Sequence, residues 1–276
     1  MNKSKGNKKK GGNLWQRKYG VVFLPLLKEI KIIKYCFICL LCIMKTIIIN
    51  SPKDLKKHQD ECWIHIQWNC EINCSLLLED LPQRLKIDWY LFIKAGGSIE
   101  AGWYIKAGGS IKAGGSIEAG WYIEAGGSIK AGEYIEAGGS IEAGWYIEAG
   151  WSIKAGGYIK AGGSIEAGWY IEAGGSIKAG EYIEAGGYIE AGDSYWVSAW
   201  LSITCKWTLS FWLRAYAGIC TWREISEEEK TITCSKLENG TIEYGILKEI
   251  WEEEIEELTV EEVCKRLGKN IKIVKS

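Results

Sequence analysis

The densest group of possible metal ligands lies between residues 58 and 74, in the stretch HQDECWIHIQWNCEINC. It contains two histidines and three cysteines: His58, Cys62, His65, Cys70 and Cys74. Zinc accepts such ligands, but neither the C-x-x-C nor the H-x-x-x-H spacing of a structural zinc site occurs here. Trp63, His65 and Gln67 alternate as one face of a strand does. We therefore expect this segment to belong to an end cap, and we predict no metal and no cofactor.

Three more cysteines, spaced C-x-x-C-x-x-C, lie in the apolar run YCFICLLCIM at residues 35–44. These apolar surroundings disfavour an iron–sulfur cluster site. The run is also shorter than the roughly 20 residues of a membrane span. Residues 1–43 carry ten Lys or Arg against one Glu, so this part is a basic leader, disordered or a signal peptide, or translation starts at Met44.

Acid–base catalysis needs a tunable side chain in a pocket. The charged residues of the central region instead follow one another regularly, because a Lys or Glu comes directly after each isoleucine of a repeat. Such a series is typical of a solvated strand face with mixed charge, so we expect no enzyme. Residues 93–192 carry seven Lys against twelve Glu, a net charge of −5 that disfavours nucleic-acid binding.

The repeat itself runs from Ile93 to Ile189, with an isoleucine at every sixth position, seventeen in all. Alanine follows two residues later and glycine three residues later. No helix has this period, whereas in a strand the isoleucine and alanine share one face. Glycine then suits a corner, because it tolerates positive φ. The pattern predicts an all-β fold, a parallel β-solenoid of hexapeptide repeats. The same phase is continued by Leu81, Ile87, Tyr195, Leu201, Trp207, Leu213 and Ile219.

The residue before each isoleucine indicates the length of a coil. From Ser116 to Tyr182 it alternates strictly between serine and tyrosine, which favours a two-sided solenoid in which two hexads make a coil of twelve. Residues 109–139 and 157–187 differ only at Ser110 and Tyr158, and their offset of eight hexads equals four such coils. The alternative is a three-sided solenoid, in which three hexads make a coil of eighteen.

In the two-sided arrangement the tyrosines form one column, flanked by tryptophans, and the serines form the opposite column. Exposed rigid aromatic residues favour protein binding, since they offer large contact area at little entropic cost. A purely structural stack is the alternative. The predicted partner-binding residues are Trp121, Tyr122, Tyr134, Trp145, Tyr146, Tyr158, Trp169, Tyr170 and Tyr182.

Four regions follow from these patterns: a leader (1–43), an N-terminal cap (44–86), the solenoid (87–223) and a small α+β C-terminal cap (224–276). In the last, Asn239-Gly240 predicts a hairpin, and Thr259 and Glu262 form a capping box before a helix and a final strand. Ten cysteines occur, but none between Cys74 and Cys205, so disulfides could not brace the repeats. We expect a reduced, cytoplasmic protein without a membrane span.

Residues 87–245 resemble a group of uncharacterised bacterial and phage solenoids with I-x-A-G repeats, including AGICTWREISEEEKTITCSKLENGTIEYG after the repeats. Bactofilins and the left-handed β-helix acyltransferases are only distantly similar. The hexad of those acyltransferases places its small residue four after the aliphatic one, and their catalytic histidine has no counterpart here beyond His65. The resemblance implies no known chemistry, although small proteins of mobile elements often bind and block host defence systems.

Together these features predict a non-enzymatic scaffold that binds a protein partner through a rigid aromatic face, as an inhibitor or adaptor. Self-association into a polymer or fibre is the alternative, which would require at least one uncapped end. Polysaccharide binding is a third possibility, since flat aromatic rows suit sugar rings.

Overall fold

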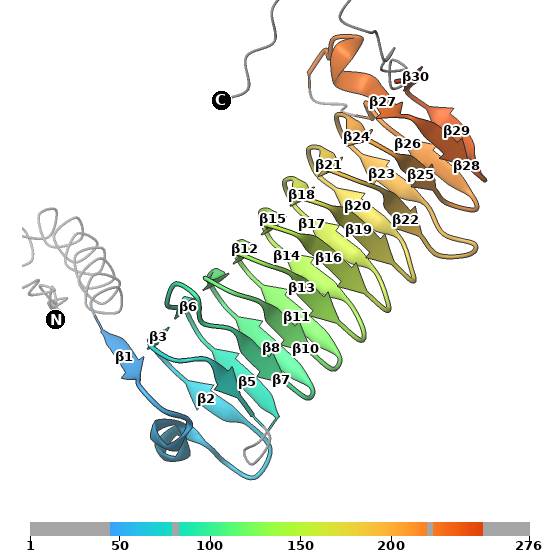
Figure 1. Ribbon diagram of the computed structural model, residues 1–276. Coiled ribbons are helices and arrows are strands. Elements are labelled where there is room, and N and C mark those ends of the chain that lie inside the picture. Colours follow the sequence, from blue (N-terminus) through green and yellow to red (C-terminus); the bar gives the residue numbers. More distant parts are fainter. Residues whose placement is uncertain (1–44, 79–82, 220–222, 251–276) are drawn as a thin grey trace, which may run out of the picture.

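The computed structural model describes residues 45–78, 83–219 and 223–250, and this part of the chain is a parallel β-solenoid. The chain passes through three parallel sheets in turn and then begins the next coil, as Figure 1 shows. We call the eleven-stranded sheet A, the ten-stranded sheet B and the nine-stranded sheet C. The regular coils run in the order C, B, A.

Most strands hold three or four residues. Sheet A contains β1 (Thr46–Ile49), β3 (Asn69–Ile72), β6 (Leu91–Ile93), β9 (Ile111–Ala113), β12 (Ile129–Ala131), β15 (Ile147–Ala149), β18 (Ile165–Ala167), β21 (Ile183–Ala185), β24 (Ile203–Cys205), β27 (Thr231–Cys234) and β30 (Ile246–Glu249). Sheet B contains β2 (Ile64–Ile66), β5 (Arg84–Ile87), β8 (Tyr104–Ala107), β11 (Tyr122–Ala125), β14 (Ile141–Ala143), β17 (Ile159–Ala161), β20 (Ile177–Ala179), β23 (Val197–Ala199), β26 (Arg214–Tyr216) and β29 (Thr241–Tyr244). Sheet C contains β4 (Leu76–Leu77), β7 (Ile99–Ala101), β10 (Ile117–Ala119), β13 (Ile135–Ala137), β16 (Ser152–Ala155), β19 (Tyr170–Ala173), β22 (Ile189–Ala191), β25 (Thr208–Ser210) and β28 (Lys236–Glu238).

The strand register gives three hexads per regular coil. Ile117 pairs with Ile135, and Ile135 pairs with Ile153 on the next coil. The preferred two-sided arrangement is therefore wrong, and the three-sided alternative is confirmed. The offset between the duplicated segments wrongly favoured coils of two hexads, because it equals eight whole hexads. Every hexad carries the same inward residues, so any hexad fits any face and a duplication need not preserve whole coils.

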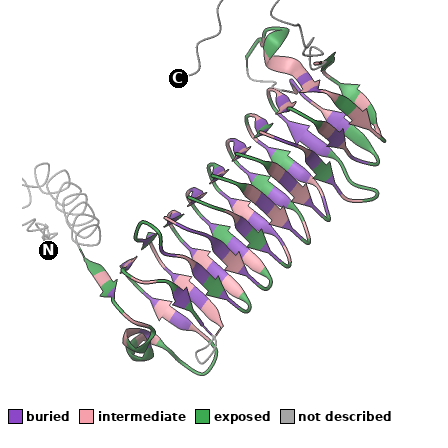
Figure 2. Ribbon diagram, in the orientation of Figure 1, coloured by how far each residue is buried: buried purple, intermediate pink, exposed green. Residues whose placement is uncertain are grey.

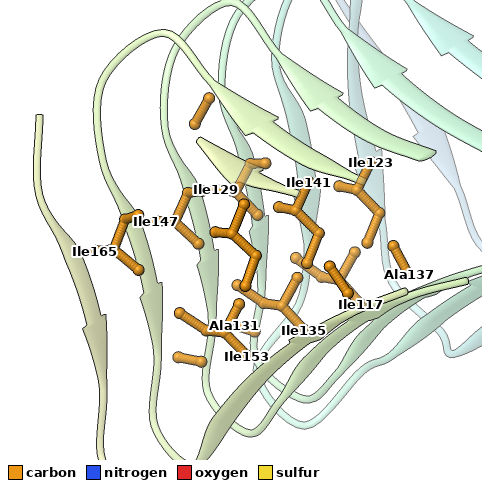
Figure 3. Close-up of a cluster of buried hydrophobic side chains, with 14 of the residues drawn as sticks. Ile117, Ile123, Ile129, Ala131, Ile135, Ala137, Ile141, Ile147, Ile153 and Ile165 are labelled. Carbon is orange, nitrogen blue, oxygen red and sulfur yellow. The ribbon is translucent and has the colours of Figure 1, made fainter. Parts of the chain in front are cut away.

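The isoleucines form the core along the whole stack. Each of the seventeen, from Ile93 to Ile189, has 0% of its surface exposed. Except for the exposed Ala95, the alanines two residues later are also buried, while the charged residue between them faces outward. Figure 2 shows these buried positions recurring along successive strands, and Figure 3 shows isoleucines from neighbouring strands pointing into the shared interior. The predicted inward face of the hexad is confirmed.

The first glycine of each corner is required by close packing rather than by its φ angle. A Cβ at Gly138 would lie 2.2 Å from the carbonyl oxygen of Gly120, one coil below. Among the described residues, positive φ angles occur outside the regular corners, at Gly96, Ser194, Gly218, Asn239, Gly240 and Gly245. The expected reason, positive φ, is thus wrong for the regular coils, where stacked backbones leave no room for a side chain.

The six-residue phase changes at both ends of the regular coils. Leu91 pairs with Ile111, so Ile93 lies at the alanine position of β6, and the corner from Ile93 to Ile99 is two residues longer than a regular corner, with Gly96 at φ 77°. The corner from Ala191 to Val197 is also two residues longer, with Ser194 at φ 69°. Val197, Ile203, Leu209 and Ala215 consequently fill the core downstream, whereas Tyr195, Trp207 and Leu213 are exposed. Upstream, Ile87 pairs with Ala107 and takes the alanine position. The predicted continuation of the phase is wrong at these positions.

Both end regions add strands to the same three sheets. At the N-terminal end, the 3-10 helix η1 (Pro52–His58) packs against β1 and β2 and buries Leu55 completely. At the other end, η2 (Glu228–Lys230) precedes β27, and β27 to β30 continue the parallel pairing. Asn239-Gly240 turns the corner between β28 and β29, which lie in different sheets, so the predicted hairpin is wrong. The expected leader, capping box and final helix lie outside the described residues.

Candidate functional site

The tyrosines are divided among all three faces. From Ser116 to Tyr182 the hexads alternate between serine and tyrosine, and a coil holds three hexads, an odd number, so over this stretch each face alternates between the two from coil to coil. The predicted single column is therefore wrong. Sheet B carries Tyr122 and Tyr158, sheet C carries Tyr134 and Tyr170, and sheet A carries Tyr146 and Tyr182. The serines are distributed in the same way.

The three predicted tryptophans also separate. Trp121 lies at the corner between sheets C and B, Trp145 between B and A, and Trp169 between A and C. All three side chains are exposed, Trp145 the most at 70%. The nine predicted residues thus do not form one surface, although each has at least part of its side chain at the surface.

A continuous aromatic surface instead follows the corner between sheets A and C. We call it the aromatic edge, and it consists of Tyr134, Trp151, Trp169, Tyr170, Tyr188 and Trp207. Trp151, Trp169 and Trp207 are 58%, 53% and 47% exposed. A Cβ at Gly187 would lie 3.1 Å from the Trp169 ring and 3.4 Å from the Trp207 ring, so both rings lie beside that glycine. Tyr170 and Tyr188 stack at 5.0 Å with an interplanar angle of 4°.

Acidic side chains flank the aromatic edge on both sides. On its five levels, the strands of sheets A and C and the corners that join them carry seven glutamates against three lysines, a net charge of −4. Two of these lysines are already paired, Lys130 with Glu148 at 2.5 Å and Lys154 with Glu172 at 2.9 Å. Within the described part of the chain, Glu184 and Glu190 have no ion-pair partner. The edge therefore combines exposed indole rings with uncompensated negative charge.

Sequence reasoning found Tyr134, Trp169 and Tyr170 of this edge and missed Trp151, Tyr188 and Trp207. The missing signal was a spacing of three hexads. Trp151 precedes Trp169 by three hexads, and Tyr188 follows Tyr170 by the same interval. Trp207 falls outside a strict period because of the two extra residues around Ser194.

Three tyrosines fold back over the serine of the preceding coil and bond to a glutamate there. The Tyr134 hydroxyl donates to Glu118 at 2.6 Å, Tyr158 donates to Glu142 at 3.1 Å, and Tyr182 donates to Glu166 at 2.6 Å. The covered serines Ser116, Ser140 and Ser164 are only 2%, 4% and 7% exposed. These hydrogen bonds are the main cause of the raised pKa of Tyr134 and Tyr182, because the neutral phenol is the donor.

A separate stack of rings lies near the N-terminal end of sheet B. Trp103 and Trp121 stack at 5.7 Å, as do Tyr104 and Tyr122, and the Arg84 guanidinium lies 5.1 Å from the Trp103 ring centroid. The rings here already contact one another and a cation. The Arg84 cation distinguishes this surface from the aromatic edge, which is flanked by glutamates.

The possible metal ligands of residues 58–74 do not converge. Cys70 lies in the core, where burial raises its pKa to about 12, and Cys62 is exposed. His65 Nε2 bonds to Asp88 at 2.8 Å, with Lys86 3.5 Å from the same carboxylate. In residues 45–78, 83–219 and 223–250, no three His, Cys, Asp or Glu side chains are grouped to hold a metal ion.

Comparison with protein-family models, with curated proteins and with solved structures finds no match for this chain. Within its described residues, no helix has the length and apolar character needed to cross a membrane.

Proposed function

We propose that this protein is a non-enzymatic scaffold that binds a basic protein segment along the aromatic edge. The observation that carries the proposal is the row of exposed tryptophans between two acidic strand columns. Rigid indole rings provide contact area with few rotamers to fix, and they attract the guanidinium and ammonium groups of arginine and lysine. Flanking carboxylates add steering and selection against acidic partners.

The dimensions suit an extended peptide. Five coils span about 19 Å at roughly 4.8 Å per coil, the length of about six extended residues. A partner segment lying along the edge could place basic side chains over Trp151, Trp169 and Trp207 in turn. The net charge of −4 in the surrounding coils makes nucleic acid an unfavourable partner.

The test uses a synthetic eight-residue peptide of alternating arginine and glycine, titrated calorimetrically into the full chain. Trp151→Ala combined with Trp169→Ala should weaken binding at least about tenfold, since truncated aromatic anchors dominate binding energy. The matched control, Trp103→Ala with Trp121→Ala, removes two exposed tryptophans beside Arg84 and should change affinity less than about twofold.

Charge is tested separately. Glu184→Gln with Glu190→Gln should weaken binding of the basic peptide and reduce its salt dependence, because neither glutamate has an ion pair to lose among the described residues. A glutamate–glycine peptide of equal length should not bind. Equal losses in the edge and control variants would refute the proposal. Concentration-dependent assembly without peptide binding would favour the polymer, and binding of a neutral glucan alone would favour the polysaccharide function.

A further inference from the structure

Sheet B contains an open position in its column of aromatic rings. Rings on neighbouring coils of this solenoid stack directly, at 5.7 Å for Tyr104 and Tyr122 and at 5.0 Å for Tyr170 and Tyr188. Further along sheet B, the same column holds Tyr158, then Ser176, then Trp196. A ring is therefore missing at the level of Ser176, between two aromatic side chains.

A cleft of about 420 Å³ lies at this position. We call it the ring slot, and it is lined by Tyr158, Ser176, Tyr195, Trp196, Lys160 and Lys178. Glycines 174 and 175 form part of its wall without contributing side chains. Its volume falls in the range of small-molecule sites, about 300–1,000 Å³.

The tyrosine–glutamate hydrogen bond seen over three other serines has no counterpart at the ring slot. At Ser140, two coils below Ser176, Tyr158 folds over the serine and donates to Glu142. At Ser176, the covering residue is Trp196, which has no hydroxyl, and the position equivalent to Glu142 is Lys178. Ser176 accordingly remains partly exposed, whereas Ser140 is buried.

The charge beside the ring slot is positive. Lys160 and Lys178 are register partners on adjacent strands of sheet B. Lys160 pairs with Glu142 at 2.6 Å, but Lys178 has no ion-pair partner among the residues that the structure describes. An anion near Lys178 would relieve the repulsion between the two ammonium groups.

We propose that the ring slot binds a planar aromatic or heteroaromatic ring that carries an anionic group. The ring occupies the level of Ser176, about 4.8 Å along the stack from the backbone levels of Tyr158 and Trp196, whose side chains line the slot. The anionic group contacts Lys178, and the Ser176 hydroxyl is available to a polar ring substituent. The site is independent of the aromatic edge, which lies between sheets A and C.

The test titrates the full chain with two ring anions, adenosine monophosphate and indole-3-acetate, which distinguish a nucleotide from an aromatic acid. Adenosine, indole, phosphate and acetate serve as ring-only and anion-only probes. At least one ring anion should bind tenfold or more tightly than both of its parts. If neither does, the proposal is wrong.

Three variants locate the binding. Ser176→Tyr supplies the missing ring and should reduce affinity more than tenfold without lowering the melting temperature, because Tyr104–Tyr122 and Tyr170–Tyr188 show that consecutive tyrosines fit. Lys178→Gln should abolish the advantage of the anionic probe over its neutral counterpart. Ser152→Tyr, the matched control on sheet C, should leave binding unchanged. Undiminished binding by both Ser176→Tyr and Lys178→Gln would overturn the assignment, whatever the basic peptide does at the aromatic edge.

Discussion

Replacing Gly162 with alanine tests the packing explanation for the invariable first glycine of each regular corner. A Cβ at this residue would lie 2.0 Å from the carbonyl oxygen of Gly144 and 3.0 Å from its carbon. Both are backbone atoms of the coil below, so no side-chain rotation can relieve the overlap. Gly162 has no positive φ angle, and alanine is therefore torsionally acceptable there.

The expected cost follows from separating two coils at this corner. Overpacking of this kind costs about 1–3 kcal/mol. The corner hydrogen bonds from Gly162 N to Ala143 O and from Gly180 N to Ala161 O, both 3.1 Å, also weaken, at about 0.5–1.5 kcal/mol for each bond that is lost. Reduced freedom of the unfolded chain returns about 0.4–1 kcal/mol. We expect a net destabilisation of about 2–4 kcal/mol, or a fall in melting temperature of roughly 4–16 °C.

Gly163→Ala is the matched control in the same corner. Its Cβ would approach the Trp145 carbonyl oxygen only to 3.1 Å, a contact that a small shift relieves. Stability should therefore change by less than about 1 kcal/mol. Thermal and guanidinium denaturation followed by circular dichroism should be compared as midpoints, because long repeat arrays can depart from two-state unfolding. Equal midpoints for the two variants, or a stabilised Gly162→Ala protein, would refute the packing explanation.

Three further changes test the core and two polar contacts. Ile141→Lys buries an unpaired charge in the middle of the stack and should eliminate the cooperative melting transition seen by circular dichroism. Tyr182→Phe removes the donor to Glu166; because the hydrogen bond raises the Tyr182 pKa, the stability difference from the parent should be present below pH about 10 and disappear as the pH rises through the raised pKa, measured by melting temperature. Partial burial raises the pKa of Asp88, but hydrogen bonds and charges from His65 and Lys86 outweigh this effect and lower the pKa overall. Asp88→Asn should therefore lower the melting temperature above pH about 4 and change it little at lower pH.

The core residues could be predicted from the sequence because the inward positions repeat the same residue types. Isoleucine and alanine two residues apart can share a buried face only in a strand, and all of these isoleucines are buried. Coil length could not be predicted in the same way. Tyrosine and serine alternate on the outer surface, where nothing requires the period of the side chains to equal the period of the coil.

The candidate site was predicted only in part for the same reason. Tyr134 and Tyr170 share a column because six hexads make two coils, whereas Tyr122 and Tyr134, two hexads apart, lie on different faces. The change of phase near Ser194 was hidden because apolar residues occupy both alternating positions: Trp196 and Val197 are adjacent, and only the structure shows which is buried. The resemblance to phage and bacterial solenoids stays a prediction.

The mismatch between the two periods has a consequence for binding. Because a coil contains three hexads, strict alternation of two residues can never place the same residue on adjacent coils of one face. Between Ser116 and Tyr182, where the alternation is strict, each face therefore presents tyrosines two coils apart, about 9.6 Å, a separation that accommodates one further ring between them. Where a tyrosine can bond to a glutamate below, as Tyr158 does with Glu142, it folds down and closes the space. Lysine at that outward position removes the acceptor of the bond, as Lys178 does beside Ser176, which stays partly exposed.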